Sequence, residues 1–232
     1  MIFSPMQVSS RIVSIVSSKI FFSAITVTTI RVMTSIALVI LVGGLLVALS
    51  SKSQIIEILA SDIVFVLAYT MPSILWVFLA LLLMGLSPLT PVIIVAIVAS
   101  PHFFLNLREG LKELDRDLIE VGQVYGDDSI STARHIALPQ LYPYIMAAFR
   151  SMMSTGWKAV IVAEVFTATS GIGYHIYESF NRYDGVGIAA WGLIILFIIL
   201  SIDRILKFVD GRFMRRYQNV EGNEKGSVNL VN

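Results

Sequence analysis

Residues 120–139 read EVGQVYGDDSISTARHIALP, a polar stretch that lies between two long apolar segments. The segment before it, residues 63–107, contains no Asp, Glu, Lys or Arg, and the segment after it, residues 141–169, contains three charged residues. Because about 20 apolar residues suffice to cross the hydrocarbon core of a bilayer, both segments predict membrane-spanning helices. The polar stretch is then a loop on one side of the membrane.

The composition of the whole chain supports a membrane protein. Of its 232 residues, 56% are hydrophobic and 14% are charged, and the mean hydropathy is +0.80, whereas a soluble domain carries about 25% charged residues. The apolar runs are continuous rather than alternating, which favours helices over barrel strands. We therefore predict an all-α integral membrane protein with about five transmembrane helices. They lie within residues 32–51, 63–107 (two helices), 141–169 and 187–209.

The remaining segments flank this predicted transmembrane domain of residues 32–216. Residues 1–31 carry scattered cations and no charged-then-apolar order ending in a cleavage site, so we expect no signal peptide. Residues 12–30 are either a weak additional span or an interfacial helix, and we favour the interfacial helix. Residues 217–232 are polar and are expected to be a disordered tail.

The distribution of cations predicts the orientation. Lys and Arg are enriched in cytoplasmic loops, and placing the polar loop of residues 108–140 in the cytoplasm puts most cations on that side. They are Lys52, Arg108, Lys112, Arg116, Arg134, Lys207, Arg212, Arg215, Arg216 and Lys225. The loop and the C-terminus are thus expected inside and the N-terminus outside. The net charge of +1 gives no reason to expect a nucleic-acid partner.

The polar loop has a pattern of its own. An apolar stripe at helical spacing predicts one helix, formed by Leu111, Leu114, Leu118, Val121 and Tyr125. This helix should end near Gly126, and a second short helix should start at Asp128 or Ser129 and continue to about His135. Pro139 then marks the start of the next span. Such a helical hairpin could transmit force, although a loop that only packs against its own bundle remains an alternative.

The spacing of the glutamate, glycine and proline residues in the loop resembles the EAA signature of ABC importer permeases. That signature reads Glu-Ala-Ala, three residues, Gly, nine residues and Ile-x-Leu-Pro, and this chain matches it in register. The matching residues are Glu120, Gly126, Ile136, Leu138 and Pro139. The two alanines are replaced by Val121 and Gly122, which affects the detailed fit to an ATPase rather than the assignment.

Three other stretches resemble the nitrate, sulfonate and taurine branch of these permeases. They are Met71-Pro72-Ser73, Thr28 with Arg31-Val32, and Glu164-Val165-Phe166 followed by Gly171-Ile172-Gly173-Tyr174. Together with the loop, the resemblance covers about residues 22–216.

The resemblance implies the type I importer fold and a set of partners. A second copy of the permease, as a homodimer, would form the pathway, and an external solute-binding protein would deliver a small polar solute. An alkyl sulfonate, nitrate, taurine or a vitamin precursor is such a solute. ATPase subunits, which bind the ATP and Mg²⁺, would dock on the loop at the cell membrane. The implied docking residues are Glu120, Val121, Gly122, Gly126, Ile136, Leu138 and Pro139.

Three charged residues fall inside the predicted span of residues 141–169. On a helical projection, Arg150, Ser154 and Glu164 lie within about 80° of one another, and Lys158 lies about 40° further round. These four residues either line a pathway, or Arg150 reaches the headgroups while Lys158 and Glu164 pair with other helices. Lys158 and Glu164 are about 120° apart and are poor partners for each other. Pro72, inside another span, is expected to kink it.

Motifs for other chemistries are absent from the sequence. There is no G-x-x-x-x-G-K-[ST] phosphate-binding loop, no H-E-x-x-H, no G-x-S-x-G and no cysteine. His102, His135 and His175 are scattered without ligand spacing. We therefore expect no catalytic residue, metal or cofactor in this chain, and a non-catalytic membrane subunit. A secondary transporter or channel without an ATPase is the alternative function.

Overall fold

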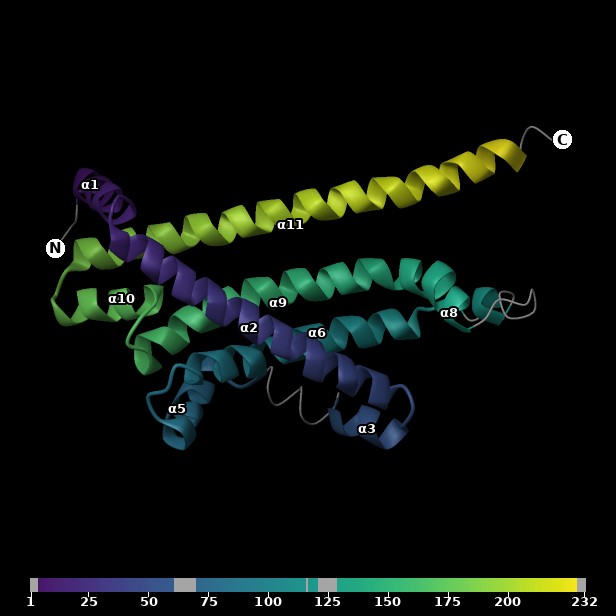
Figure 1. Cartoon of the computed structure of the whole chain (residues 1–232), viewed down its shortest axis with the longest axis horizontal. Helices are drawn as coiled ribbons and strands as arrows, with labels where there is room; N and C mark the ends of the chain where they lie inside the picture. Colours follow the sequence, from purple (N-terminus) through teal and green to yellow (C-terminus); the bar gives the residue numbers. More distant parts are fainter. Residues whose placement is uncertain (1–3, 61–69, 116, 121–128, 229–232) are drawn as a thin grey trace. The chain divides into compact units, whose positions relative to one another are not determined.

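The computed structural model describes residues 4–60, 70–115, 117–120 and 129–228 (Figure 1). Within these ranges the chain forms helices joined by turns, and no strand occurs. The predicted all-α class is confirmed. The chain divides into two compact units, residues 1–194 and residues 195–232. The first unit holds every site discussed below.

The N-terminal region forms two helices, α1 (Pro5–Val16) and α2 (Lys19–Ser50). Ser18 separates them and caps α2, because its hydroxyl accepts the Phe21 N–H at 3.3 Å. No proline interrupts residues 19–50. The helix that contains the first candidate span therefore begins at Lys19 rather than at residue 32, so residues 19–30 belong to this long helix and α1 is separate from it.

Three helices follow: α3 (Gln54–Ile58), α5 (Ser73–Met84) and α6 (Thr90–Lys112). Pro72 is the N-cap of α5, so it precedes this helix rather than kinking its interior. A turn separates α5 from α6. Gly85 has φ +66°, a conformation that favours glycine, and its carbonyl accepts the Thr90 hydroxyl at 2.9 Å.

The single helix predicted over residues 111–125 is wrong in its first half. Helix α6 ends at Lys112, and a new helical turn starts at residue 117. Asp115 causes the break, because its carboxylate accepts the N–H groups of Asp117 at 3.0 Å and Leu118 at 3.2 Å. Val121, Tyr125 and Gly126 lie outside the described residues.

The second half of the loop continues directly into the next span. Helix α8 (Ser129–Thr132) leads through a π-helical turn (Ala133–Ala137) into α9 (Leu138–Thr167). Pro139 lies in the first turn of α9, as predicted for the start of a span, but the short helix and the span form one continuous helix. Proline cannot donate a hydrogen bond to the preceding turn, and the wider π turn just before Pro139 accommodates this loss.

Two more helices complete the chain, α10 (Ile172–Asn181) and α11 (Gly185–Val228). Helix α10 is bent by 47° from the axis of α9. Helix α11 continues to Val228, beyond the point where a disordered tail was predicted. No proline in residues 185–228 stops it.

The number of spans can be compared with the five predicted. Helices α2, α6 and residues 185–208 of α11 are long and apolar enough to cross a membrane, and the bent pair of α9 and α10 makes a fourth if it counts as one span. Helix α5 is a shorter apolar helix of 12 residues. The fifth predicted span falls on α5 and on residues 61–69, which lie outside the described residues.

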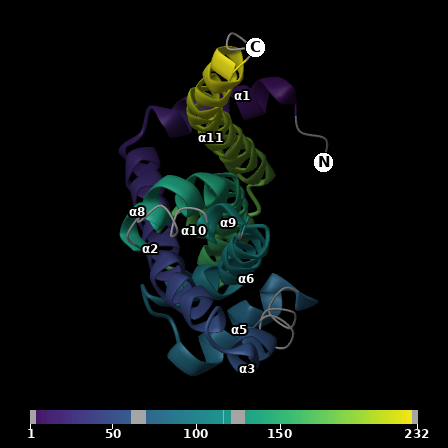
Figure 2. The ribbon, with the colours of Figure 1, turned by 90° about the vertical axis from the view of Figure 1, so that its right-hand side faces the viewer.

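Helices α2, α6 and α9 form the packed centre of the first unit (Figures 1 and 2). Helix α6 packs along α9, and α2 packs on both. The α6–α9 contact is tight: a Cβ added at Gly110 would lie 2.7 Å from Tyr144 Cβ. Helices α1 and α10 lie at one end of this bundle, and α3 and α8 lie at the other (Figure 1).

Candidate functional site: a buried ion pair and a polar loop at opposite ends of the bundle

Two of the sequence stretches that resemble the nitrate and sulfonate branch meet at the α10 end of the bundle. Thr28 and Arg31 come from α2, Glu164 comes from α9, and residues 170–173 form the turn into α10. We call this set the α9–α10 cluster: Thr28, Arg31, Glu164, Ser170, Gly171 and Gly173. It sits where α9 bends into α10.

Glu164 is the centre of the cluster, and its side chain is completely buried. Its carboxylate accepts hydrogen bonds from Arg31 Nη1 at 2.7 Å and from the Gly173 N–H at 2.9 Å. The Thr28 hydroxyl lies 3.0 and 2.9 Å from the two carboxylate oxygens. The same hydroxyl oxygen accepts the Ile172 N–H at 2.9 Å. One carboxylate thus binds α2 and the start of α10 to α9.

Arg31 completes the cluster and is 8% exposed. Besides Glu164, its guanidinium donates to the Ser170 carbonyl at 2.7 Å and the Ser170 hydroxyl at 3.1 Å. A buried ion pair is tolerated when further hydrogen bonds satisfy both partners, and that condition is met here. Glu164 was predicted either to line a pathway or to pair with another helix, and the structure shows that it pairs with Arg31 of α2.

Two glycines make room for the carboxylate. Gly171 has φ +103°, and a Cβ there would lie 2.3 Å from Glu164 Oε1. A Cβ at Gly173 would lie 2.4 Å from the Ile161 carbonyl oxygen. Both glycines of the Gly-Ile-Gly sequence thus allow the turn to approach α9 closely, and Gly171 also allows the positive φ angle of the turn.

We expect Gly173→Ala to displace α10 from α9. The added methyl group would overlap a backbone oxygen that has little freedom to move, and such overpacking costs about 1–3 kcal/mol. Gly192→Ala is the matched control, because a Cβ at Gly192 meets nothing within 4 Å. Thermal unfolding in detergent should show a lower midpoint for the first variant alone. Equal midpoints for the two variants would contradict the close approach.

The other charged residues of α9 have different surroundings from Glu164. Lys158 and Ser154 are exposed on the first unit, and Arg150 is half-buried. His102 of α6, one of the three scattered histidines, forms a 3.0 Å hydrogen bond between its Nδ1 and the Ser151 hydroxyl. Nothing in the spacing of His102 and Ser151 along the chain indicates this contact.

The polar loop lies at the opposite end of the bundle. Of the predicted docking residues, Glu120 and Leu138 are exposed and Ile136 and Pro139 are half-buried. Val121, Gly122 and Gly126 lie outside the described residues.

The base of the loop is anchored to the bundle by polar contacts. The Asp115 N–H donates to Gln140 Oε1 at 2.9 Å. Arg108 pairs with Glu57 of α3 at 2.7 Å, and Lys112 lies 3.4 Å from the same oxygen. The hydrogen bonds from Arg108 and Lys112 hold the pKa of Glu57 below its ordinary value. The flanks of the loop are thereby tied both to α9 and to α3.

Residues 40–215 match the model of a protein family described as the binding-protein-dependent transport system inner membrane component. This range covers more than half of the chain. The chain belongs to this family. The matched residues include the polar loop, Glu164 and the glycine turn, whereas Thr28 and Arg31 precede them.

Individual relatives belong to the same kind of transport system. The chain is 33% identical over 96 residues to SsuC of Escherichia coli strain K12, which is named as an aliphatic sulfonates transport permease protein; the match covers 41% of this chain and 36% of SsuC. It is 26% identical over 144 residues to the nitrate import permease protein NrtB of Synechococcus elongatus, covering 60% of this chain and 51% of NrtB. The chain thus matches about half or less of the length of these two permeases.

A solved structure supports the permease fold. The crystal structure of an amino acid ABC transporter with histidines contains a chain that superposes with a TM-score of 0.66. The match covers 91% of this permease-family chain and 100% of the other, at 16% identity. At that identity the likeness concerns the fold.

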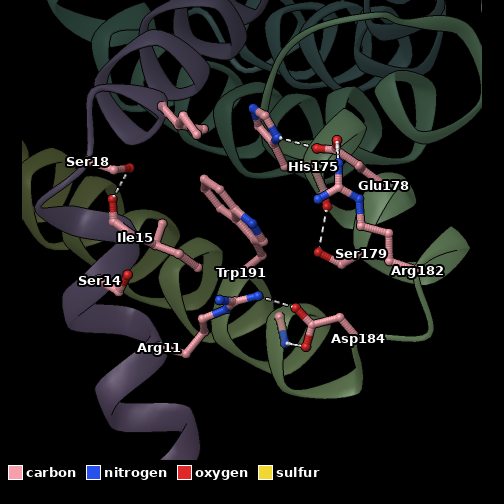
Figure 3. A pocket seen from close by; sticks show the side chains of 12 residues that line it. Arg11, Ser14, Ile15, Ser18, His175, Glu178, Ser179, Arg182, Asp184 and Trp191 are labelled. Atoms are coloured by element: carbon pink, nitrogen blue, oxygen red, sulfur yellow. Dashed lines mark hydrogen bonds and ion pairs between the residues drawn. The ribbon is translucent and has the colours of Figure 1, made fainter.

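Helix α1 of this permease-family chain borders a cavity of about 240 Å³ with α10 and the start of α11 (Figure 3). Arg11 forms an ion pair with Asp184, and Glu178 binds Arg182 at 2.6 Å and His175 at 3.3 Å. The His175 ring stacks on Trp191 with centroids 5.3 Å apart. These charges are paired within the cavity wall, so the cluster fastens α1 rather than presenting one sign of charge to a ligand.

We expect the attachment of α1 to depend on pH only in the acid range. The hydrogen bond from the Gly187 N–H, and to a smaller extent the Arg11 guanidinium, lowers the pKa of Asp184 in the folded state. Because the pKa of Asp184 is lowered by folding, its carboxylate stabilises the attachment of α1 at pH values above the ordinary pKa of about 3.9. This stabilisation is lost as the pH falls through the pKa of the folded state. Hydrogen exchange of residues 5–16, corrected for intrinsic rates, should rise only below about pH 4. Asp184→Asn should raise it at pH 7; protection unchanged in that variant would contradict the attachment.

Proposed function

We propose that this chain is the non-catalytic permease subunit of an ATP-driven importer of the nitrate and sulfonate type, carrying a small polar solute. Family membership and the named activities of SsuC and NrtB support the class of transporter. The observation that carries the mechanism is the continuous helix from Ser129 to Thr167. It joins the second half of the predicted docking loop to the α9–α10 cluster.

This continuity suggests how work done on the loop reaches the opposite end. At 1.5 Å per residue, the helix over residues 129–167 is about 58 Å long. A displacement of α8 by a docked ATPase would move α9 as a rod, and α9 carries Glu164 with its bonds to Arg31 and Gly173. Closure of the ATPases would then change the packing of α2 and α10 and switch access between the two sides of the membrane.

The proposal includes a set of partners and an orientation. ATPase subunits that bind ATP and Mg²⁺ would dock on residues 108–140 in the cytoplasm, and a second copy of the permease would complete the pathway. A solute-binding protein would dock at the α10 end, outside the cell membrane. The proposed docking residues remain Glu120, Val121, Gly122, Gly126, Ile136, Leu138 and Pro139. The C-terminus is placed inside and the N-terminus outside.

Co-purification tests the proposal against a secondary transporter or a channel. The tagged chain is extracted from its own host in mild detergent, and the proteins that accompany it are identified. We expect an ATPase with a phosphate-binding loop in stoichiometric amount, lost when residues 110–139 are disrupted. Recovery of the intact chain without an ATPase, even after cross-linking, would contradict the proposal and favour the alternative class.

A further inference from the structure

The seam between α6 and α9 carries a stripe of polar side chains that the ion pair at Glu164 does not use. On α9, residues three or four positions apart share one side of the helix, and here they are Tyr144, Ala147, Ser151, Ser154 and Lys158. On α6, Asn106 and His102 lie one turn apart and face the same seam, since His102 bonds to Ser151. We call His102, Asn106, Ser151, Ser154 and Lys158 the seam stripe.

Lys158 is the charged member of the seam stripe. It lies within the 30-residue helix α9, its side chain is exposed on the first unit, and no described carboxylate forms an ion pair with it. An exposed cation at this depth is strongly disfavoured against hydrocarbon, so charged residues inside spans face a water-filled cavity or a partner. By contrast, Glu164 of the same helix is buried and fully paired.

The other members of the seam stripe supply further polar groups. His102 is half-buried and bonds to the Ser151 hydroxyl at 3.0 Å, and Ser151 lies two turns before Lys158 on the same side of α9. Its carbonyl accepts the Asn106 side-chain amide at 2.6 Å. Ser154 lies one turn before Lys158 and is exposed. The stripe therefore combines one cation with hydroxyl and imidazole groups, in a wall that is otherwise apolar.

An open groove continues the seam toward the polar loop. It measures about 590 Å³ and is lined by Asn106 and Glu109 of α6 and by Pro143, Tyr144 and Ala147 of α9, with Leu105. Ala147 is one turn from Ser151, and Asn106 is one turn from His102. The groove and the seam stripe thus follow one another along the same pair of helices.

We propose that the seam stripe faces the aqueous pathway and that Lys158, on the same side of α9 as Ser151 with its bond to His102, binds an anionic solute in transit. The inference rests on the proposed importer function and specifies the charge of its solute. A cation next to hydroxyl donors in an apolar wall attracts small oxyanions, such as nitrate or an alkyl sulfonate, and repels cations. A carboxylate from a second copy, or a lipid headgroup, is the competing partner for Lys158, and both are separable by experiment.

Because these 232 residues contain no cysteine, an introduced cysteine is the single thiol among them and its accessibility can be measured. Ser154→Cys places a thiol one helical turn from Lys158. The reaction rate of this thiol is measured in membranes that contain the full chain. Two water-soluble thiosulfonate reagents are used, one carrying an anionic sulfonate group and the other a cationic ammonium group. Each rate is divided by that of a small thiol in solution. Leu41→Cys is the control, because Leu41 is 73% exposed on the apolar surface of α2.

We expect both water-borne reagents to reach Ser154→Cys, with the anionic reagent faster, while Leu41→Cys reacts only with a lipid-soluble maleimide. Adding Lys158→Met should lower the anion-to-cation rate ratio about tenfold, the effect of one charge about 6 Å away in water, and Lys158→Arg should preserve it. No reaction with water-borne reagents would place the face in lipid. A ratio unchanged by Lys158→Met would mean that a partner neutralises Lys158. Either result overturns the inference, and neither depends on whether an ATPase co-purifies.

Discussion

Arg31→Ala is expected to destabilise the folded chain by about 3–5 kcal/mol, the usual cost of removing one partner of a buried ion pair. The variant leaves the Glu164 carboxylate completely buried with its principal cation gone. It also frees both Ser170 acceptors. We expect α10 to separate from α2 while α6 and α9 stay packed. The free energy of unfolding, measured by titration with sodium dodecyl sulfate in mixed micelles, reports the loss.

The double variant Arg31→Met with Glu164→Leu separates the ion pair from the packing of these side chains. Replacing a buried pair by apolar groups of similar size is often close to neutral, so the double variant should recover much of the stability. Arg31→Lys should lie between wild type and Arg31→Ala, because an ammonium cannot reproduce the geometry of a guanidinium. If Arg31→Ala unfolds like the wild type, the α9–α10 cluster does not hold α10 in place.

Gly126→Leu is expected to abolish coupled uptake while leaving insertion intact. In the EAA-type pattern this glycine sits at the turn of the loop, and a bulky side chain there would block the turn from seating on an ATPase. ATP hydrolysis in reconstituted vesicles should persist at its basal rate and lose its response to solute-loaded binding protein. We expect at least a tenfold loss of uptake, about 1.4 kcal/mol of coupling free energy.

Gly44→Leu provides the control for added bulk. Gly44 lies in α2, where a Cβ would meet nothing within 4 Å, so this variant should insert and transport normally. The two variants are compared at equal membrane abundance. Normal solute-dependent uptake by Gly126→Leu would contradict the coupling role of the loop.

The sequence predicted the helical class and several helix boundaries because these depend on local chemistry. Long charge-free runs predict the spans that contain α5 and α6, and the short helix expected from Asp128 or Ser129 begins at Ser129. The resemblance also singled out Thr28, Arg31 and Glu164. Their convergence could not be predicted, because 133 positions separate Arg31 from Glu164. Such a pairing depends on how α2 crosses α9, which no local pattern records.

The errors in the loop have a common physical origin. The apolar stripe over residues 111–125 carries no sign of the capping by Asp115, whose carboxylate starts a new helical turn. Pro139 marks the start of α9 but does not separate it from the preceding short helix, because a π turn joins the two. In both places hydrogen bonding of the backbone, rather than hydrophobic periodicity, decides whether the helix breaks or continues.

Site-specific photocross-linking tests the central claim most directly. A photoreactive amino acid replaces Ile130 in α8, which is 76% exposed, or Tyr183 at the α10 end, which is 96% exposed. The proposal predicts that Ile130 cross-links to an ATPase in intact cells and Tyr183 does not. Two results would contradict a coupling loop at the α8 end of the bundle. One is an ATPase adduct from Tyr183 but not from Ile130, and the other is the lack of any ATPase adduct from either position in a chain that still transports.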